Sequence, residues 1–176
     1  MTLEHERQEQ FERCVDACAD SLFRVAFRLT GNRTLAHELV QETYLSAWKG
    51  IGSLKSVERM KGWLFAILRN QYTKLIRKES RAASTREHLD SIAATSNSNE
   101  AVVDAVQAAI GQLDEKHKLP VLLVAMEGLS VDDAAAALEL PRGTVLSRLH
   151  RGRQKLKLIL TAELSGVIEI EGHDGI

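Results

Sequence analysis

The stretch LPRGTVLSRLHRGRQKLKL, at residues 140–158, carries six Lys or Arg side chains and no acidic one, although the chain of 176 residues has a formal net charge of only −1. At about 3.6 residues per helical turn, Val145, Leu149 and Leu156 share one helix face with Leu160, which lies just beyond the stretch. The opposite face gathers polar side chains: Ser147, His150, Arg151 and Gln154. We expect the first face to pack on a domain and the second to present a guanidinium and small polar groups to a DNA major groove.

The residues before this stretch predict a second, shorter helix. Ser130, followed by Asp133, has the spacing of a capping box, which predicts a helix over 131–138. Glu139-Leu140 predicts a tight turn, and Pro141 suits the first position of the next helix, where its missing N–H does no harm. Helix, short turn and helix together predict a helix-turn-helix. A solvated basic surface helix is the alternative, but such a helix would not require the capped helix and turn.

Positive charge is concentrated in one other place. Residues 49–81 carry nine basic and two acidic side chains, while the segments before, between and after the two basic blocks are net negative. Such sorting is typical of a protein that grips a polyanion at two places.

Helical periodicity extends over most of the chain. The first apolar stripe repeats at spacings of three and four: Phe11, Cys14, Cys18, Leu22, Val25 and Leu29. Gly31 suits the end of that helix and Asn32 suits the cap of the next, at about 34–49. A third helix is expected from around Arg59. No stretch alternates like a strand before residue 166, so the chain is predicted to be all-α.

The predicted helices fall into two small domains joined by a flexible linker. Residues 82–101, AASTREHLDSIAATSNSNEA, lack large hydrophobic clusters and are rich in Ser, Thr, Asn and Ala, which indicates the linker. The first domain is then 1–81, and the second, with the helix-turn-helix, is 102–162. Gly128 is expected to end a helix before residue 131. Residues 163–176 form an acidic C-terminal tail.

Several functional classes find no support in the sequence. Cys14 and Cys18 are the only cysteines, and no ligand set for a zinc site lies near them, so small core positions suit them better. The six histidines lack metal-ligand spacing, and neither a nucleophile constellation nor a glycine-rich phosphate loop occurs. We therefore expect no metal, no cofactor and no catalysis. Without a long apolar run or a signal peptide, a cytoplasmic protein is expected.

Three segments resemble the sigma-70 family of RNA polymerase sigma factors, especially the extracytoplasmic-function (ECF) group, which has regions 2 and 4 only. GLSVDDAAAALELPRGTVLSRLHRGRQKL resembles region 4, ELVQETYLSAW resembles the polymerase-binding helix of region 2, and GWLFAILRNQYTKLIRK resembles the promoter-melting, minus-ten-reading helix. The resemblance covers about 11–160. It implies a factor that binds core RNA polymerase through the β′ coiled coil and β flap, binds promoter DNA, is held by an anti-sigma factor, and is a monomer when free.

The resemblance also implies roles for individual residues. The implied polymerase contacts are Glu38, Gln41, Glu42, Tyr44 and Trp48. The implied minus-ten DNA contacts are Lys55, Arg59, Asn70, Lys74, Arg77 and Arg81. The implied minus-thirty-five DNA contacts are Arg142, Thr144, Ser147, Arg148, His150, Arg151, Arg153 and Lys155. Core packing is the alternative for Tyr44 and Trp48, and it is favoured over base stacking for Trp63.

Some positions depart from the family pattern. Leu146 replaces a usual Lys or Arg and could meet a thymine methyl group instead. Gly152 replaces a usual Ala, at a cost of roughly 1 kcal/mol in helix propensity unless close packing requires it. Leu35 and His37 replace usual acids. Pro120 lies within a single helix of the family, so we expect a kink or a late start there.

Two other functions fit parts of the sequence. A free-standing helix-turn-helix regulator would dimerise and bind duplex DNA without polymerase. A sigma-like decoy would sequester an anti-sigma factor, but it would have no need for Arg151 on an intact basic face.

Overall fold

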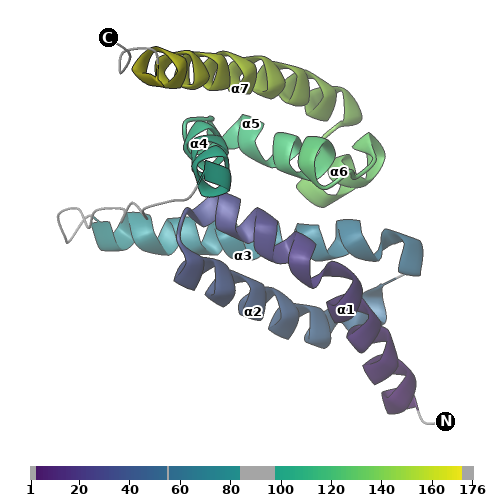
Figure 1. The fold of residues 1–176 in the computed structure, drawn as a ribbon. Coiled ribbons are helices and arrows are strands. Elements are labelled where there is room, and N and C mark those ends of the chain that lie inside the picture. The colour runs from purple at the N-terminus through teal and green to yellow at the C-terminus, as the bar shows by residue number, and fades with distance from the viewer. Residues whose placement is uncertain (1–2, 55, 84–97, 172–176) are drawn as a thin grey trace.

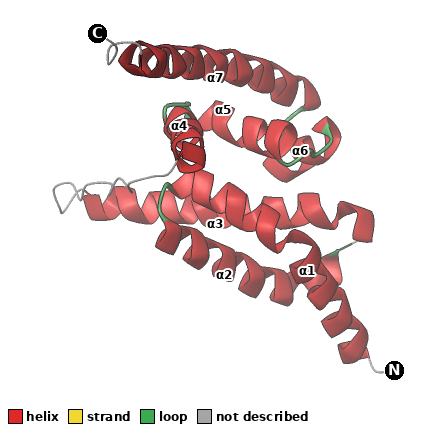
Figure 2. Cartoon of the chain, in the orientation of Figure 1, coloured by secondary structure: helices red, strands yellow, loops and turns green. Residues whose placement is uncertain are grey.

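The computed structural model describes residues 3–54, 56–83 and 98–171, and within these ranges all the regular structure is helical (Figure 2). The first part consists of α1 (Leu3–Thr30), α2 (Arg33–Gly50), the short helices η1 (Ile51–Ser53) and η2 (Val57–Arg59), and α3 (Met60–Ala83). The second part consists of α4 (Ser98–Gly111), α5 (Glu115–Pro120), the π-helical η3 (Val121–Met126), α6 (Val131–Leu138) and α7 (Arg142–Glu171). The all-α prediction is confirmed.

The junction between α1 and α2 forms as its sequence predicts. Gly31 has φ +63°, a left-handed conformation that glycine adopts readily, and its N–H donates to the carbonyl of Phe27 at 2.8 Å. The side-chain oxygen of Asn32 accepts from the backbone N–H groups of Thr34 (2.9 Å) and Leu35 (3.0 Å). A helix end and a helix start therefore follow one another within two residues.

The apolar stripes of α1, α2 and α3 pack together. The stripe predicted for α1 is buried at Cys14, Cys18, Leu22, Val25 and Leu29, and Phe11 is partly buried against it. It meets buried side chains of α2 and α3: Ala36, Leu39, Ala47, Leu64, Phe65 and Leu68. The expected core role of the two cysteines is confirmed by this burial.

Pro120 was expected to cause a kink or a late start, and the structure shows an irregularity directly after it in place of a late start. The helix begins at Glu115, passes through Pro120 and then widens into the π turn η3. The N–H of Glu127 bonds the carbonyl of Leu122, five residues back, at 3.0 Å. The irregularity directly follows the residue that has no N–H to complete an α-helical ladder. Gly128, at φ +70°, ends this helix as predicted.

The helix-turn-helix consists of α6 and α7. The hydroxyl of Ser130 accepts from the N–H of Asp133 at 3.0 Å and donates to its carboxylate at 2.6 Å, so α6 has the predicted cap and bounds. Glu139 makes the turn with φ +54°. Pro141 precedes α7 instead of occupying its first position, and its carbonyl accepts from the N–H of Val145. The acidic tail begins as a continuation of α7 to residue 171.

The helices form two layers (Figure 1). The first contains α1, α2 and α3, and the second contains α4 to α7, with α6 packed on α3 and α4 packed on α1. In the second layer α7 lies on the side away from the first layer, so its outer face is open. Buried apolar residues of both layers form one continuous cluster. Most of the predicted linker, 84–97, lies outside the described residues.

Two properties of the described residues bear on the kind of site to look for. None of their helices is long and apolar enough to cross a membrane. Nor do they contain a group of three His, Cys, Asp or Glu side chains that could hold a metal ion.

Candidate nucleic-acid and protein interfaces

The helix α7 turns its apolar face to the protein and its polar face to solvent. Val145 and Leu149 are buried, and Leu156 and Leu160 are half-buried. The opposite side chains are exposed: Ser147, His150, Arg151 and Gln154. The two faces predicted from the sequence are confirmed. Gln154 belongs to the exposed centre, although the set of implied DNA contacts omits it.

The candidate minus-thirty-five residues form the centre of this exposed face, at Ser147, His150 and Arg151, and its edges. By helical geometry, Arg142 and Arg153 flank it on one side, and Arg148 and Lys155 flank it on the other. All eight side chains of the set are exposed except Thr144 and Arg148, which are half-buried. A polar centre with basic edges suits a helix lying in a groove between two phosphate backbones.

Two of these basic side chains have carboxylate partners within the chain. Arg142 Nε lies 3.0 Å from Asp132 Oδ1, and Lys155 Nζ lies 2.5 Å from Asp114 Oδ2. The Lys155 ammonium holds the pKa of the Asp114 carboxyl below its usual range. Among the described side chains, Arg151 has no such partner. Exposed ion pairs of this kind are weak, so both cations can exchange their carboxylate for a phosphate.

The outer face of α2 carries most of the candidate polymerase contacts. Glu38, Gln41 and Glu42 are exposed, and so is Trp48, with 41% of its surface accessible. Leu45 lies on the same face and is 55% exposed, a large apolar side chain that the candidate set omits. The sequence could have identified Leu45, because it lies seven residues after Glu38 and three after Glu42 and so shares their helix face.

Tyr44 points toward the protein instead. It is half-buried and packs edge-on against Phe11, with ring centroids 6.1 Å apart. Burial raises the pKa of Tyr44 to about 12. Trp48 also packs edge-on against Phe11, and the guanidinium of Arg7 lies 5.2 Å from its ring centroid. Core packing therefore accounts for Tyr44, whereas Trp48 has both a packed edge and an exposed one.

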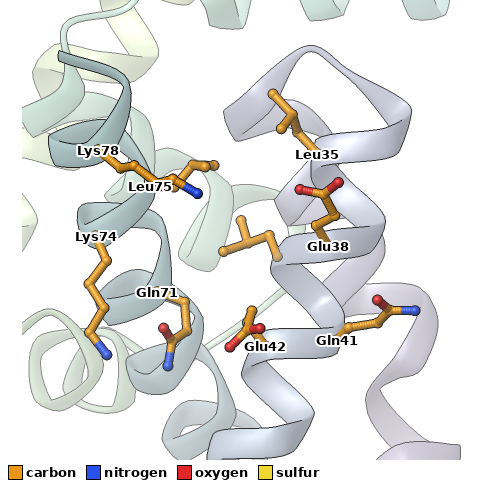
Figure 3. A pocket seen from close by; sticks show the side chains of 9 residues that line it. Leu35, Glu38, Gln41, Glu42, Gln71, Lys74, Leu75 and Lys78 are labelled. Atoms are coloured by element: carbon orange, nitrogen blue, oxygen red, sulfur yellow. The ribbon is translucent and has the colours of Figure 1, made fainter. Parts of the chain in front are cut away.

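A groove of about 380 Å³ runs between α2 and α3 (Figure 3). The α2 wall contains Glu38, Gln41 and Glu42, and the α3 wall contains Lys74 and Lys78. The side-chain amide of Gln71 donates to the hydroxyl of Ser46 at 2.6 Å and ties the two helices together. The groove thus has an acidic wall and a basic wall.

The candidate minus-ten residues do not form one cluster. Lys74 lies in the groove with the candidate polymerase contacts, whereas Arg59, just before α3, lines a different groove. Asn70 accepts from the guanidinium of Arg69 at 2.7 Å, and Arg77 is exposed. Lys55 lies outside the described residues, as does the side chain of Arg81.

The second groove has a volume of about 340 Å³ and lies where α3 meets α6. The first layer contributes Arg59, Gly62 and Trp63, and α6 contributes Asp132 and Asp133. Trp63 is half-buried and packs on the apolar cluster, as favoured from the sequence.

Three of the positions that depart from the family pattern have clear environments. Leu146 is 40% exposed in the second turn of α7. Leu35 lines the groove between α2 and α3. His37 is exposed and lies against Phe23, with ring centroids 4.5 Å apart.

An exposed polar recognition helix on a two-layer helical body defines a helix-turn-helix protein of the DNA-binding class. Residues 14–82 match the family model of sigma-70 region 2, and residues 104–156 match that of sigma-70 region 4. The chain is 34% identical over 149 residues to the ECF RNA polymerase sigma factor EcfG of Rhodopseudomonas palustris, covering 82% of this chain and 81% of that protein. The chain belongs to the sigma-70 family, in its ECF group.

Other relatives agree with this assignment. The ECF RNA polymerase sigma factor SigE of Mycolicibacterium smegmatis is 32% identical over 147 residues, which are 79% of this chain and 57% of SigE. Among solved structures, the sigma factor RpoE in complex with the anti-sigma factor NepR, from Bartonella quintana, superimposes with a TM-score of 0.78 at 27% identity, covering 86% of this chain and 96% of that one. CnrH in complex with the cytosolic domain of CnrY gives a TM-score of 0.67 at 25% identity, covering 88% of this chain and 90% of that one.

Proposed function

We propose that this protein binds core RNA polymerase and directs promoter-specific transcription initiation, with no catalysis of its own. The observation that carries the proposal is the presence of sigma regions 2 and 4 in family order, with the polar face of α7 open to solvent. Because its partners would be polymerase and promoter DNA, the protein would act in the cytoplasm. The domains follow the two regions: 1–81, a linker at 82–101, 102–162 and the tail.

Region 4 would read the minus-thirty-five duplex. The centre of the exposed face of α7 would approach the base edges, and the basic side chains at its edges would hold phosphates. Arg151 is the strongest candidate for a base contact because it lies opposite the buried stripe and has no carboxylate partner among the described side chains. The same region would contact the β flap of polymerase.

Region 2 would bind the β′ coiled coil through α2 and the opened minus-ten strand through α3. Leu45 and Trp48 provide apolar surface on the outer face of α2, and Glu38, Gln41 and Glu42 provide the polar surface around it. Interfaces commonly combine an apolar centre with a polar rim. Because Lys74 and Glu42 line the same groove, the two proposed surfaces would lie next to each other.

An anti-sigma factor is the remaining proposed partner. RpoE and CnrH, to which this chain is similar, were each solved in complex with a second protein, and NepR is named as an anti-sigma factor. We propose that a protein of this kind holds the chain, which is a monomer when free.

Charge reversal on α2 tests polymerase binding. Glu42→Lys should weaken retention of the chain on immobilised core polymerase, because Glu42 lies on the proposed contact face. Leu45→Ser should do the same by removing apolar surface. Glu12→Lys is the matched control, since Glu12 is also exposed, on α1, and its described side-chain hydrogen bond is to Gln8. If both α2 variants were retained as well as the wild type, this face of α2 would not be the polymerase-binding surface.

In-vitro transcription with core polymerase and a promoter library tests the function as a whole. A sigma factor gives transcripts from a defined subset of promoters. A free-standing regulator would instead bind duplex DNA as a dimer without polymerase, and a decoy would bind an anti-sigma factor but give no transcripts.

A further inference from the structure

One large apolar side chain lies uncovered on the part of α7 that is proposed to enter the DNA groove. Leu146, in the second turn of α7, is 40% exposed, whereas Val145 before it and Leu149 after it are buried. The two apolar clusters that the described residues form include Val145 and Leu149 but leave Leu146 out. Packing within the chain therefore does not account for a leucine at this position.

Around the helix axis, Leu146 lies between the polar centre of the exposed face and one of its basic edges. At about 100° per residue, it lies about 40° from His150 of the centre and about 40° from Arg142 of the edge. Arg153, also of that edge, lies about 20° away and two turns further along. The guanidinium of Arg142 is held by α6, with Nε 3.0 Å from Asp132 Oδ1. Leu146 thus faces the border between the base edges and one phosphate backbone.

The major groove offers a leucine one kind of partner on the base edges. Hydrogen-bond donors and acceptors cover most of each edge, and its distinct apolar group is the C5-methyl group of thymine. This methyl group is the outermost group of the base-pair edge on the thymine's own strand, next to that strand's backbone. A side chain at the border between the centre and the edge of α7 would meet the groove at this place.

The surroundings of Leu146 distinguish it from an ordinary exposed leucine. Single apolar side chains are common on protein surfaces and by themselves indicate nothing. The exposed side chains next to Leu146 on the helix surface, however, are polar or cationic. Leu146 also belongs to the N-terminal turns of α7, the part of a recognition helix that contacts base edges. Leu158 of the same helix is 72% exposed but lies beyond those turns, so it serves as a comparison.

We propose that Leu146 is a specificity-determining residue, which contacts the C5-methyl group of one thymine in the minus-thirty-five duplex and so selects a T·A pair there. The inference deepens the proposed function and rests on it, because it requires the exposed face of α7 to enter the major groove. Since leucine has neither a charge nor a hydrogen-bonding group, the contact adds selectivity without adding to the salt dependence of binding.

The test starts from a duplex that the protein itself selects. A library of duplexes, randomised over the minus-thirty-five region, is selected with the full-length chain alone and with the chain bound to core polymerase. The enriched duplex is then synthesised with deoxyuridine in place of each thymidine in turn. Deoxyuridine pairs as thymidine does but has no C5-methyl group, so each substitution removes only the apolar contact.

The wild type should bind about fourfold more weakly when the methyl group is removed at one particular position, which is the effect of burying one such group. Leu146→Ala should bind the thymidine and deoxyuridine duplexes equally at that position. Leu146→Met, which keeps an apolar side chain, should retain the preference for the methyl group. Leu158→Ala is the matched control and should respond as the wild type does, because residue 158 lies about 18 Å further along α7. Circular dichroism checks that each variant keeps its helices.

A measurement with 5-methylcytosine runs in the opposite direction. When the responsive T·A pair is replaced by C·G, 5-methylcytosine adds a methyl group at the same place in the groove. The wild type should bind the methylated duplex about fourfold more tightly than the unmethylated one. Leu146→Ala should not distinguish the two.

Several results would overturn the inference. If no thymine in the selected duplex responds to loss of its methyl group, or if Leu146→Ala responds as the wild type does, Leu146 does not contact a thymine. A selection that enriches no duplex with either form of the protein would overturn the proposed function and the inference together. A methyl response of the chain alone, without binding to core polymerase, would overturn the proposed function and leave the thymine contact standing.

Discussion

Gly152 of α7 and Val121 of η3 pack so closely that no side chain fits between them. A Cβ at residue 152 would lie 2.6 Å from Val121 Cγ2, well inside normal contact distances, and 3.3 Å from the Cβ of His117, which is a tight contact. The glycine that departs from the family alanine is therefore required by close packing. It fixes the recognition helix against the helix that carries Glu127 at its end.

Gly152→Ala should lower the free energy of unfolding. Overpacking typically costs about 1–3 kcal/mol, and the gain in helix propensity of roughly 1 kcal/mol offsets only part of it. Urea denaturation followed by circular dichroism measures the change as a lower midpoint. Gly143→Ala is the control on the same helix, because a Cβ at residue 143 meets nothing within 4 Å. A Gly152→Ala protein more stable than the wild type would show that Val121 moves aside at no cost.

Arg151→Ala should flatten the base preference at one minus-thirty-five position. A bidentate arginine contact to guanine is typically worth about 1–3 kcal/mol of discrimination, and the exposed place of Arg151 opposite the buried stripe suits it. Competition binding over single-base variants at two salt concentrations measures this. If affinity falls uniformly and the base preference stays intact, α7 does not lie in the groove as proposed.

Lys155→Ala should act differently. It should weaken binding to all DNA sequences about equally, and it should reduce the slope of log affinity against log salt concentration by roughly one unit, as expected of a phosphate contact. The structure adds that Lys155 must first leave Asp114. Asp114→Asn should therefore tighten duplex binding slightly, by freeing the lysine. A variant Lys155→Ala with an altered base preference would argue for a base contact at this position.

Acid should destabilise the protein through His117. Burial lowers the pKa of His117, the nearby Lys155 adds to this, and the hydrogen bond to Asp114 opposes it only in part. Because its pKa is lower in the folded chain than in the unfolded one, the unfolded chain binds the proton first, and stability is lost as pH falls below about 6.5. Urea midpoints measured from pH 8 to pH 5 should fall less for His117→Gln than for the wild type. Parallel pH profiles would exclude this role.

Cys14 and Cys18 should react slowly with thiol reagents in the native protein. They are 0% and 3% exposed, and burial raises the pKa of both thiols, so little thiolate forms and reagents have no access. Ellman's reagent at pH 8 should label them far more slowly without urea than in it. Fast native labelling would mean that the first layer opens readily around α1.

The sequence by itself determined the features that depend on neighbours within about a turn. Asn32 and Ser130 cap the helices predicted for them, Gly31 and Gly128 end helices, and the two faces of α7 follow from the helical period. These signals are local, because a cap or an amphipathic face involves residues only a few positions apart. The two family motifs, which occur in the family's order, then indicated that the chain resembles the sigma-70 family.

Only the tertiary structure decided which distant groups meet. Arg24 and Glu127 are 103 residues apart in the chain, and nothing in their local sequence pairs them. The separation of Lys74 from Arg59 into different grooves, and the contact that excludes a side chain from residue 152, likewise arise from helix packing. A period of three or four residues sets which face of a helix is buried, but the partner of that face depends on packing between helices far apart in the chain.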